Sequence, residues 1–224
     1  MPAGVLVFDM DGVLVDVTES YREAIRQTVK YFTGSEISNG RIQDLKNAGG
    51  WTNDWDVTHR LIQDLGFRAA YEAVVAQFQS VFLGDGEDGL MRREKWVARP
   101  GLLEGFSRDY RLAVFTGRPR AEAQMTLDRF ASQLTFDPLV GAEDVEHGKP
   151  APDGLRKITA VTGAEKIWYV GDTVDDARSA RAAGVPFIGI AAQSSPRRAE
   201  LVALFEAENA SAVLADINQL ETVL

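Results

Sequence analysis

Cysteine is absent from this chain of 224 residues. Disulfide bonds and thiolate metal sites are therefore excluded, and the absence fits a reducing compartment, so we expect a cytoplasmic protein. Long hydrophobic runs are missing as well. The first apolar run is interrupted by Asp9 and is too short for a signal peptide, and no stretch approaches the length of a membrane span, so we expect neither feature.

Positive charge is scarce. The chain has 24 lysines and arginines against 33 aspartates and glutamates, which gives a formal net charge of −9. This balance argues against general nucleic-acid binding, and an anionic substrate would need a local cation, either a metal or well-placed Lys and Arg. The composition is that of an ordinary globular protein, and the length allows one large domain or a core with a smaller domain.

Two aspartates follow the first apolar run at an informative spacing. The run Val5–Phe8 predicts a buried strand, and Asp9 and Asp11 come directly after it. Strand periodicity directs these two side chains the same way and Met10 the other way. A buried carboxylate pair is costly unless a cation, a shared proton or substrate chemistry offsets the repulsion. Gly12 lets the chain turn at the strand end, where open α/β sheets bind their ligands.

The pattern of apolar residues divides the chain into a helical block and an alternating part. Helical spacing predicts helices over residues 21–32, 42–45, 57–65 and 71–82, whose apolar stripes are interpreted as core packing, and a glycine-rich loop follows at 84–89. From about Arg99, strands alternate with helices, which predicts a parallel sheet with right-handed crossovers. The predicted strands cover residues 112–115, 139–140, 167–170, 186–190 and 212–214, and the predicted helices cover residues 121–130 and 176–183.

The helical block lies between two strands of one predicted sheet. The strand before Asp9 belongs to this sheet, yet roughly 80 residues separate it from the next strand, which is too long for an ordinary loop. We therefore expect a helical cap inserted into an α/β core.

Polar residues follow four segments of the predicted sheet. They are Asp9 with Asp11, then Thr116 with Gly117, then Lys149 between a glycine and a proline, and finally Asp172 with Asp175 and Asp176. Because the carboxyl ends of parallel strands lie at one edge of a sheet, all four groups can converge. Three or four carboxylates with a hydroxyl and a lysine favour a hard divalent cation, and oxygen ligands in an octahedral shell indicate Mg²⁺.

In the same order, these residues resemble the four motifs of the haloacid dehalogenase superfamily. Asp9-Met-Asp-Gly-Val matches the first motif, Thr116-Gly the second, Lys149-Pro the third and Gly171-Asp-Thr-Val-Asp-Asp176 the fourth. Four motifs in order, each after a predicted strand, are a far stronger signal than one. The resemblance implies a Rossmann-like parallel α/β core of residues 1–15 and 97–224, with an α-helical cap domain of residues 16–96 between the first and second motifs.

The resemblance also implies a phosphatase that forms an aspartyl-phosphate. Asp9 would be the nucleophile, and Asp11 would protonate the leaving oxygen and then activate water. Asp9, Asp172 and the backbone carbonyl of Asp11 would bind Mg²⁺. Asp176, which the family pattern favours over Asp175, would complete or orient that metal shell.

The phosphoryl group would be held by the second and third motifs. Thr116 and the amide of Gly117 would bind phosphoryl oxygens, and Lys149 would neutralise charge on the phosphoryl group and on Asp9. Arg118 is a candidate substrate contact, although an arginine after a loop is usually solvated. Asp16 is interpreted as a cap of the following helix rather than as a ligand.

The segment Lys46–Trp55 is the second candidate region. Its glycines, tryptophans and polar residues suit a loop that closes over a ligand. Lys46 resembles in position the cap residues that contact substrate in relatives, and Gly50 and Trp51 are further candidates for substrate binding. Packing of the cap helices is an equally weighted interpretation of Trp51, and the favoured one for Trp55.

Several functions stay open at this point. The leading hypothesis is hydrolysis of a small phosphorylated metabolite, with histidinol phosphate, sugar phosphates and phosphoglycolate as candidates. A sugar-phosphate phosphomutase would retain every motif. Halide removal and phosphonate cleavage are disfavoured, because relatives with those activities lack the second aspartate, here Asp11.

A receiver-type signalling domain is the non-enzyme alternative. It also has an acidic pair after its first strand, but its phosphorylated aspartate lies on a later strand and no helical insert of this size is expected. We expect no nucleic-acid or membrane partner, and the amphipathic cap helices could support a homodimer.

Overall fold

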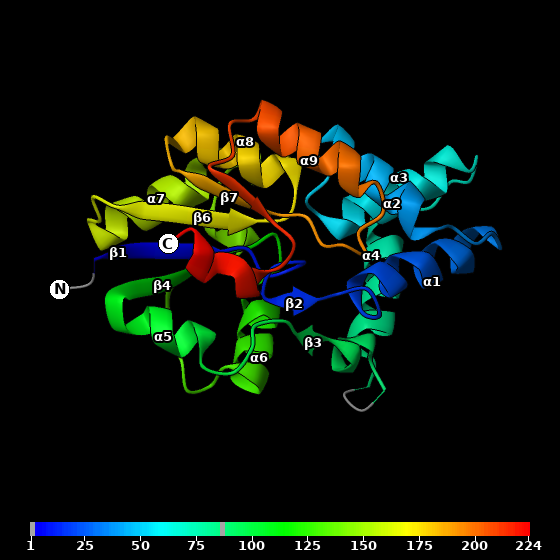
Figure 1. The fold of residues 1–224 in the computed structure, drawn as a ribbon. Coiled ribbons are helices and arrows are strands. Elements are labelled where there is room, and N and C mark those ends of the chain that lie inside the picture. Colours follow the sequence, from blue (N-terminus) through cyan, green and yellow to red (C-terminus); the bar gives the residue numbers. More distant parts are fainter. Residues whose placement is uncertain (1–2, 86–87) are drawn as a thin grey trace. The chain divides into compact units, whose positions relative to one another are not determined.

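The computed structural model describes residues 3–85 and 88–224, which fall into two compact units. The first joins the chain up to Val15 with Trp96–Leu224, and the second is Asp16–Lys95 (Figure 1). Strands β2 (Val15–Asp16) and β3 (Lys95–Trp96) pair in a two-stranded sheet where the chain passes from one unit to the other. Among the described residues, no helix is both long and apolar enough to cross a membrane.

The first unit is built on a six-stranded sheet in the order β5-β4-β1-β6-β7-β8, whose neighbouring strands run parallel. The predicted parallel α/β core is therefore confirmed. The strands are β1 (Gly4–Phe8), β4 (Tyr110–Phe115), β5 (Phe136–Val140), β6 (Ile167–Gly171), β7 (Phe187–Ile190) and β8 (Ala212–Leu214).

Helices cover both faces of this sheet. They are α5 (Leu102–Asp109), α6 (Arg120–Phe130), α7 (Asp153–Thr162), α8 (Val174–Ala183) and α9 (Arg198–Ala207), with short 3-10 helices η2 (Ala142–Asp144) and η3 (Ile217–Thr222). Leu155 of α7, Ala177 of α8 and Phe205 of α9 belong to one apolar cluster with the strands. Figure 1 shows α5 and α6 on the opposite face. The predicted helices α6 and α8 are confirmed, whereas α5, α7 and α9 were not predicted.

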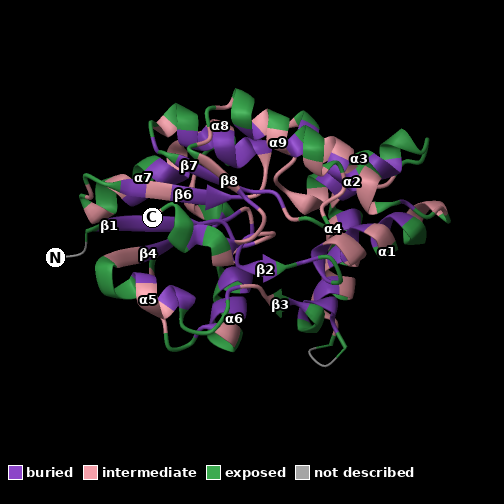
Figure 2. Ribbon diagram, viewed as in Figure 1, coloured by how far each residue is buried: buried purple, intermediate pink, exposed green. Residues whose placement is uncertain are grey.

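Strand β1 lies between β4 and β6 in the middle of the sheet, and every one of its residues is apolar or glycine, as this position requires. All five residues are buried, as Figure 2 shows, and a strand buried on both faces needs such a continuous apolar run. Phe8 pairs with Val114 of β4 on one side and with Val170 of β6 on the other. This register brings the residues that follow β1, β4 and β6 to the same edge of the sheet.

The second unit is helical, as predicted. Its helices are α1 (Tyr21–Thr33), α2 (Asn39–Ala48), α3 (Asp54–Asp64) and α4 (Tyr71–Leu83), and the 3-10 helix η1 (Leu90–Arg93) follows. The apolar stripe of α4 packs on α1, where the ring centroid of Tyr21 lies 4.1 Å from that of Phe82 and 5.9 Å from that of Phe78. Stripes of this kind stabilise a unit mainly by removing apolar surface from water.

The prediction for Asp16 is wrong. The N-cap of α1 is Ser20, and the Asp16 carboxylate instead accepts a hydrogen bond of 2.9 Å from the backbone N–H of Thr18. An aspartate two residues before an N–H donor forms a local turn, and this turn precedes the helix rather than capping it. Part of the predicted loop, residues 86–87, lies outside the described residues.

Candidate active site

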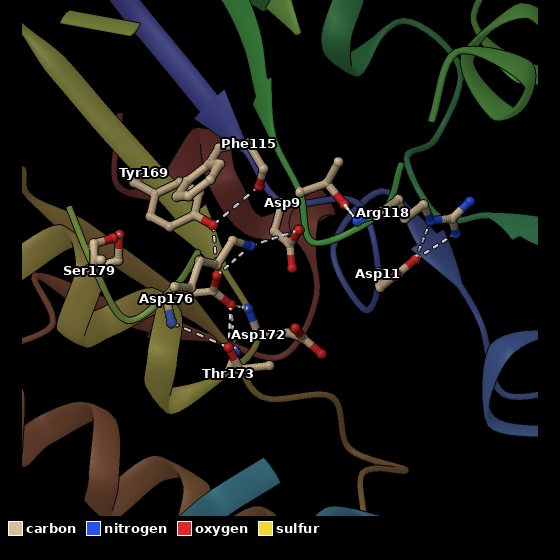
Figure 3. A network of polar contacts seen from close by, with 12 residues as sticks. Asp9, Asp11, Phe115, Arg118, Tyr169, Asp172, Thr173, Asp176 and Ser179 are labelled. Carbon is tan, nitrogen blue, oxygen red and sulfur yellow. Dashed lines mark hydrogen bonds and ion pairs between the residues drawn. The ribbon is translucent and has the colours of Figure 1, made fainter. Parts of the chain in front are cut away.

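The predicted strand-end residues meet at one edge of the core sheet. Asp9 follows β1, and its backbone N–H donates to the carbonyl of Val170 at 2.8 Å. Thr116 follows β4 in the same way, with its N–H donating to Val140 at 3.0 Å. Each polar residue thus continues the parallel ladder by one step beyond the apolar strand. The side chains converge where the helices and loops that follow these strands begin (Figure 3).

Lys149 links two buried carboxylates at this edge. Its Nζ lies 3.0 Å from Oδ1 of Asp9 and 2.7 Å from Oδ1 of Asp176, and its side chain is 4% exposed. The ammonium also lies 5.0 Å from the ring centroid of Phe115 and 5.5 Å from that of Tyr169. Aromatic faces and carboxylates both attract a cation, so they hold Lys149 in one position.

Asp176 is held from all sides. Its Oδ1 accepts the hydroxyl proton of Tyr169 at 2.6 Å in addition to facing Lys149. Its Oδ2 accepts from the hydroxyl of Thr173 at 2.6 Å and from the backbone N–H groups of Thr173 and Asp172 at 2.9 and 3.2 Å. Thr173 is also the N-cap of α8 and completes a capping box with Asp176. The carboxylate of Asp176 therefore orients its neighbours.

The two carboxylates that share Lys149 differ in pKa. Burial raises the pKa of Asp9 to about 7, and Lys149 opposes this shift while Asp176 and Asp11 add to it by repulsion. Burial acts on Asp176 in the same direction, but Lys149 and the donors from Thr173 and Tyr169 outweigh it, so its pKa is lowered. Burial also opposes the charge of Lys149, and the two carboxylates overcome it and raise the pKa of that ammonium.

Three carboxylates are arranged as a cation site. Oxygens of Asp9, Asp172 and Asp176 lie within 4.8 Å of one another. Carboxylate oxygens are the ligands that Mg²⁺ takes in proteins, so the donor set fits this ion. Gly12 is required beside it, because it has φ +74° and a Cβ there would lie 1.9 Å from Oδ2 of Asp172. Only a residue without a side chain lets the turn after β1 approach this carboxylate.

Arg118 contacts the second aspartate of the first motif. Its Nε and Nη2 lie 2.9 and 2.5 Å from Oδ1 of Asp11, and its Nη1 donates to the Thr126 hydroxyl at 2.9 Å. The expectation that this arginine is solvated is wrong, because the residue is 2% exposed. Its backbone N–H donates to Oγ1 of Thr116 at 3.2 Å, around the half-buried Gly117.

Asp175 points to a different set of charges. It is buried in the first turn of α8, and its Oδ1 lies 3.7 Å from Nη1 of Arg178. The Nε of the same arginine lies 3.0 Å from Oε1 of Glu208. The three-carboxylate cluster contains Asp176 and not Asp175. The geometry thus separates the two adjacent aspartates that sequence reasoning left as alternatives.

The candidate residues of the helical unit lie together at the end of α2 and after it. Lys46 Nζ is 2.8 Å from Oδ1 of Asp54, and both side chains are largely buried. Gly50 is exposed with φ +81°, and Arg60 lies over the ring of Trp51 at 5.9 Å. Lys46 is therefore oriented within its own unit by the ion pair with the first residue of α3.

Tyr169 and Phe115 were missed as site residues. Each lies in the apolar run of a strand, where the alternation of a buried strand predicts only core packing. The one available signal was the tyrosine hydroxyl of Tyr169, because a buried hydroxyl needs a hydrogen-bond partner. That partner is Asp176, seven residues further along the chain.

Comparisons with known proteins agree with this geometry. The family model of haloacid dehalogenase-like hydrolases matches residues 4–184. An imidazoleglycerol-phosphate dehydratase of Phytophthora nicotianae is 36% identical over 199 residues, which are 84% of this chain but only 43% of that protein. A phosphoglycolate phosphatase of Cereibacter sphaeroides is 31% identical over 196 residues, with 81% of this chain and 82% of that protein covered.

Solved structures show the same fold. A putative haloacid dehalogenase-like hydrolase from Bacteroides fragilis superposes with a TM-score of 0.77 at 23% identity, covering 98% of this chain and 100% of that one. The acidic site lies at the carboxyl ends of the strands of an open parallel sheet, which is where α/β proteins bind their ligands. The chain belongs to the haloacid dehalogenase-like hydrolase family.

Proposed function

We propose that this hydrolase is a phosphatase that depends on Mg²⁺ and hydrolyses a small phosphorylated metabolite through an aspartyl-phosphate on Asp9. The position of Asp9 carries the proposal, because its carboxylate lies 3.0 Å from Lys149 and belongs to the three-carboxylate cluster. A carboxylate can attack a phosphate anion only where cations offset the repulsion. Lys149 supplies one such charge.

The proposed reaction has two displacement steps at phosphorus. In the first, an oxygen of Asp9 bonds to phosphorus while the bond to the leaving oxygen breaks, and Asp11 gives its carboxyl proton to that oxygen. In the second, Asp11 takes a proton from water, the water oxygen bonds to phosphorus, and the bond to Asp9 breaks. An alcohol and inorganic phosphate leave, and both carboxyl groups return to their starting states.

The remaining residues of the core site bind and orient. Asp9 and Asp172 would hold Mg²⁺ with the backbone carbonyl of Asp11, and Asp176 suits orientation because both its oxygens already accept hydrogen bonds. When bound, the ion would supply positive charge for the carboxylate and the phosphoryl group. Thr116 and the amide of Gly117 would bind phosphoryl oxygens.

The substrate is proposed as a class. Phosphoglycolate phosphatases are among the relatives that this chain matches over four-fifths of their length, so phosphoglycolate belongs in the first panel together with sugar phosphates and histidinol phosphate. A phosphomutase would use the same core residues but return the phosphoryl group to a sugar. A receiver-type domain is disfavoured, because the family match over residues 4–184 spans the helical insert as well as strands β1, β4, β5 and β6.

Phosphate release from this panel, with Mg²⁺ and with EDTA, tests the proposal. We expect repeated turnover with Mg²⁺ only, and no measurable turnover by Asp9→Asn, whose circular dichroism should match that of the wild type. Asp11→Asn should be slower by about 100-fold, the usual contribution of a general acid. Turnover by Asp9→Asn equal to that of the wild type on every substrate would refute the mechanism, and sugar isomers without net phosphate release would favour the mutase.

A further inference from the structure

Two nitrogens of Arg118 contact the same oxygen of Asp11. Both its Nε and its Nη2 contact Oδ1 of Asp11, at 2.9 and 2.5 Å. Figure 3 shows the two side chains pointing toward each other, to one side of Asp9. Because both donors belong to one rigid guanidinium, they fix the position of Oδ1, and the covalent link of the carboxyl group to the backbone then restricts where Oδ2 can lie.

The two partners differ in exposure. The Arg118 side chain is 1% exposed, whereas that of Asp11 is 29% exposed. The arginine is anchored from behind by the hydroxyl of Thr126, at 2.9 Å, and this hydroxyl in turn donates to the carbonyl of Glu122 in α6. A buried arginine held by a helix is a fixed point, and Asp11 is the partner that reaches the solvent-accessible side of the site.

We propose that Arg118 is a positioning residue for proton transfer, which holds Oδ1 of Asp11 so that Oδ2 faces the reacting oxygen. This inference rests on the proposed function, in which Asp11 is the acid and base. Oδ2 loses its proton to the leaving oxygen in the first step and gains one from water in the second, while Oδ1 keeps both guanidinium donors throughout. The arginine thereby acts through Asp11 and not on the phosphate.

The leaving group provides the test. A poor leaving group, such as the alcohol of an alkyl phosphate, needs a proton to depart, whereas p-nitrophenolate leaves without one. We therefore compare kcat/KM of purified full-length protein with Mg²⁺ on an alkyl phosphate and on p-nitrophenyl phosphate. This ratio reports the formation of the aspartyl-phosphate and not its later hydrolysis, in which Asp11 acts on both substrates alike. The variants are Arg118→Met, Arg118→Lys, Asp11→Asn and the double variant Asp11→Asn/Arg118→Met.

We expect Arg118→Met to lower kcat/KM on the alkyl phosphate by about 10- to 100-fold and on p-nitrophenyl phosphate by less than about threefold. A phosphate-binding arginine would instead lower kcat/KM on both substrates to the same extent. Arg118→Lys should fall between Arg118→Met and wild type, because one ammonium cannot replace the fork. The double variant should be no slower than Asp11→Asn, because both changes remove the same function.

Arg120→Met is the matched control. Arg120 is two residues away, its side chain is 46% exposed, and it contacts Asp144, so its loss should leave both kcat/KM values unchanged. Circular dichroism and urea unfolding establish that each variant is folded. The double variant removes the charges of Arg118 and Asp11 together, so it leaves no carboxylate without its partner. It can therefore still be measured if Arg118→Met alone does not fold.

The outcomes separate the two claims. If Asp11→Asn lowers kcat/KM equally on both substrates, the acid role of Asp11 fails, and with it the proposed mechanism. If kcat/KM of Asp11→Asn discriminates between the leaving groups but that of Arg118→Met does not, only the positioning role is overturned. An equal loss of kcat/KM on both substrates in Arg118→Met, or losses that multiply in the double variant, likewise overturns it.

Discussion

Lys149 and Asp176 form an ion pair of 2.7 Å in which both side chains are almost fully buried. The same ammonium lies 3.0 Å from Asp9, so one cation serves two carboxylates. Without a bound metal, the three groups carry one more negative than positive charge when both carboxylates are ionised. Burial raises the pKa of Asp9, the repulsion from Asp176 adds to this shift, and the site is therefore sensitive to substitution, pH and metal.

Replacing Lys149 by Met should destabilise the metal-free protein strongly. Two carboxylates would stay buried without their cation, and breaking a buried pair costs about 3–5 kcal/mol. Urea unfolding in EDTA measures the loss, and added Mg²⁺ should restore part of it by binding only the folded state. Lys157→Met is the control, because the side chain of Lys157 is 43% exposed beside Asp144. Equal losses of unfolding free energy in Lys149→Met and Lys157→Met would show that the buried ion pair contributes no more to stability than an exposed one.

The stability of the metal-free protein should fall as pH rises from about 4 to 7. The pKa of Asp9 in the folded state is about 7, raised from an ordinary value of 3.8. Because the pKa is higher in the folded state, the contribution of Asp9 to the free energy of unfolding is fully present below the unfolded pKa and is lost as pH rises through the folded pKa. The free energy of unfolding falls by at most about 1.4 kcal/mol per pH unit from this group. Thermal melts in EDTA at several pH values measure the slope, and Asp9→Asn should lack this part of it.

Mg²⁺ binding should show the opposite dependence on pH. The ion competes with the proton on Asp9, so its affinity should increase as pH rises toward and past 7. Calorimetric titration with Mg²⁺ at pH 6 and pH 8, in buffers of different ionisation enthalpy, would detect the released proton. Affinity independent of pH would place the ion away from Asp9.

Gly12→Ala should weaken metal binding by more than its backbone strain explains. Gly12 has φ +74° and Gly34 has φ +70°, so alanine is strained at both positions, by roughly 1 kcal/mol. A Cβ at Gly12 would also collide with Asp172, whereas one at Gly34 meets nothing within 4 Å. Mg²⁺ titrations of activity should therefore show about tenfold weaker binding for Gly12→Ala only, as for other displaced ligands. Similar Mg²⁺ affinities for the two variants would contradict the placement of Asp172.

Lys46→Ala should change the ranking of substrates and leave the Mg²⁺ requirement unaltered. Lys46 is held by Asp54 at 2.8 Å in the helical unit, and we predict that it contacts the part of the substrate that does not react. The measurement is kcat/KM across the phosphate panel at several Mg²⁺ concentrations. Lys30→Ala, which removes an exposed lysine paired with Glu36 in the same unit, is the control. A shifted Mg²⁺ requirement with an unchanged ranking would show that the role of Lys46 is misassigned.

Most of the core site could be predicted because its residues follow strands directly. The apolar run before Asp9 and the one before Thr116 each indicate a buried strand, and parallel strands end at one edge. The roles of the two adjacent aspartates could not be separated in this way. Asp176 meets Lys149 and Tyr169, while Asp175 meets Arg178, and this depends on which face of α8 turns toward the sheet.

Three helices of the core and the environment of Arg118 were out of reach for a related reason. Helices α5, α7 and α9 each bury only two or three apolar side chains, such as Leu201 and Phe205 in α9. Arg118 follows a loop, where an arginine is usually solvated, and its burial depends on the packing of α6 against the turn after β4.

The amino-acid sequence by itself determined the six strands of the core sheet, the four helices of the second unit, the polar residues that follow the strands and the acidic character of the site. These properties depend on neighbours a few positions away, through periodicity, turn residues and the alternation of strands with helices. Only the tertiary structure decided which donor meets which carboxylate oxygen. Asp11 and Arg118 are 107 positions apart, and contacts over such a separation exist only once strand order and register have brought the two chain segments together.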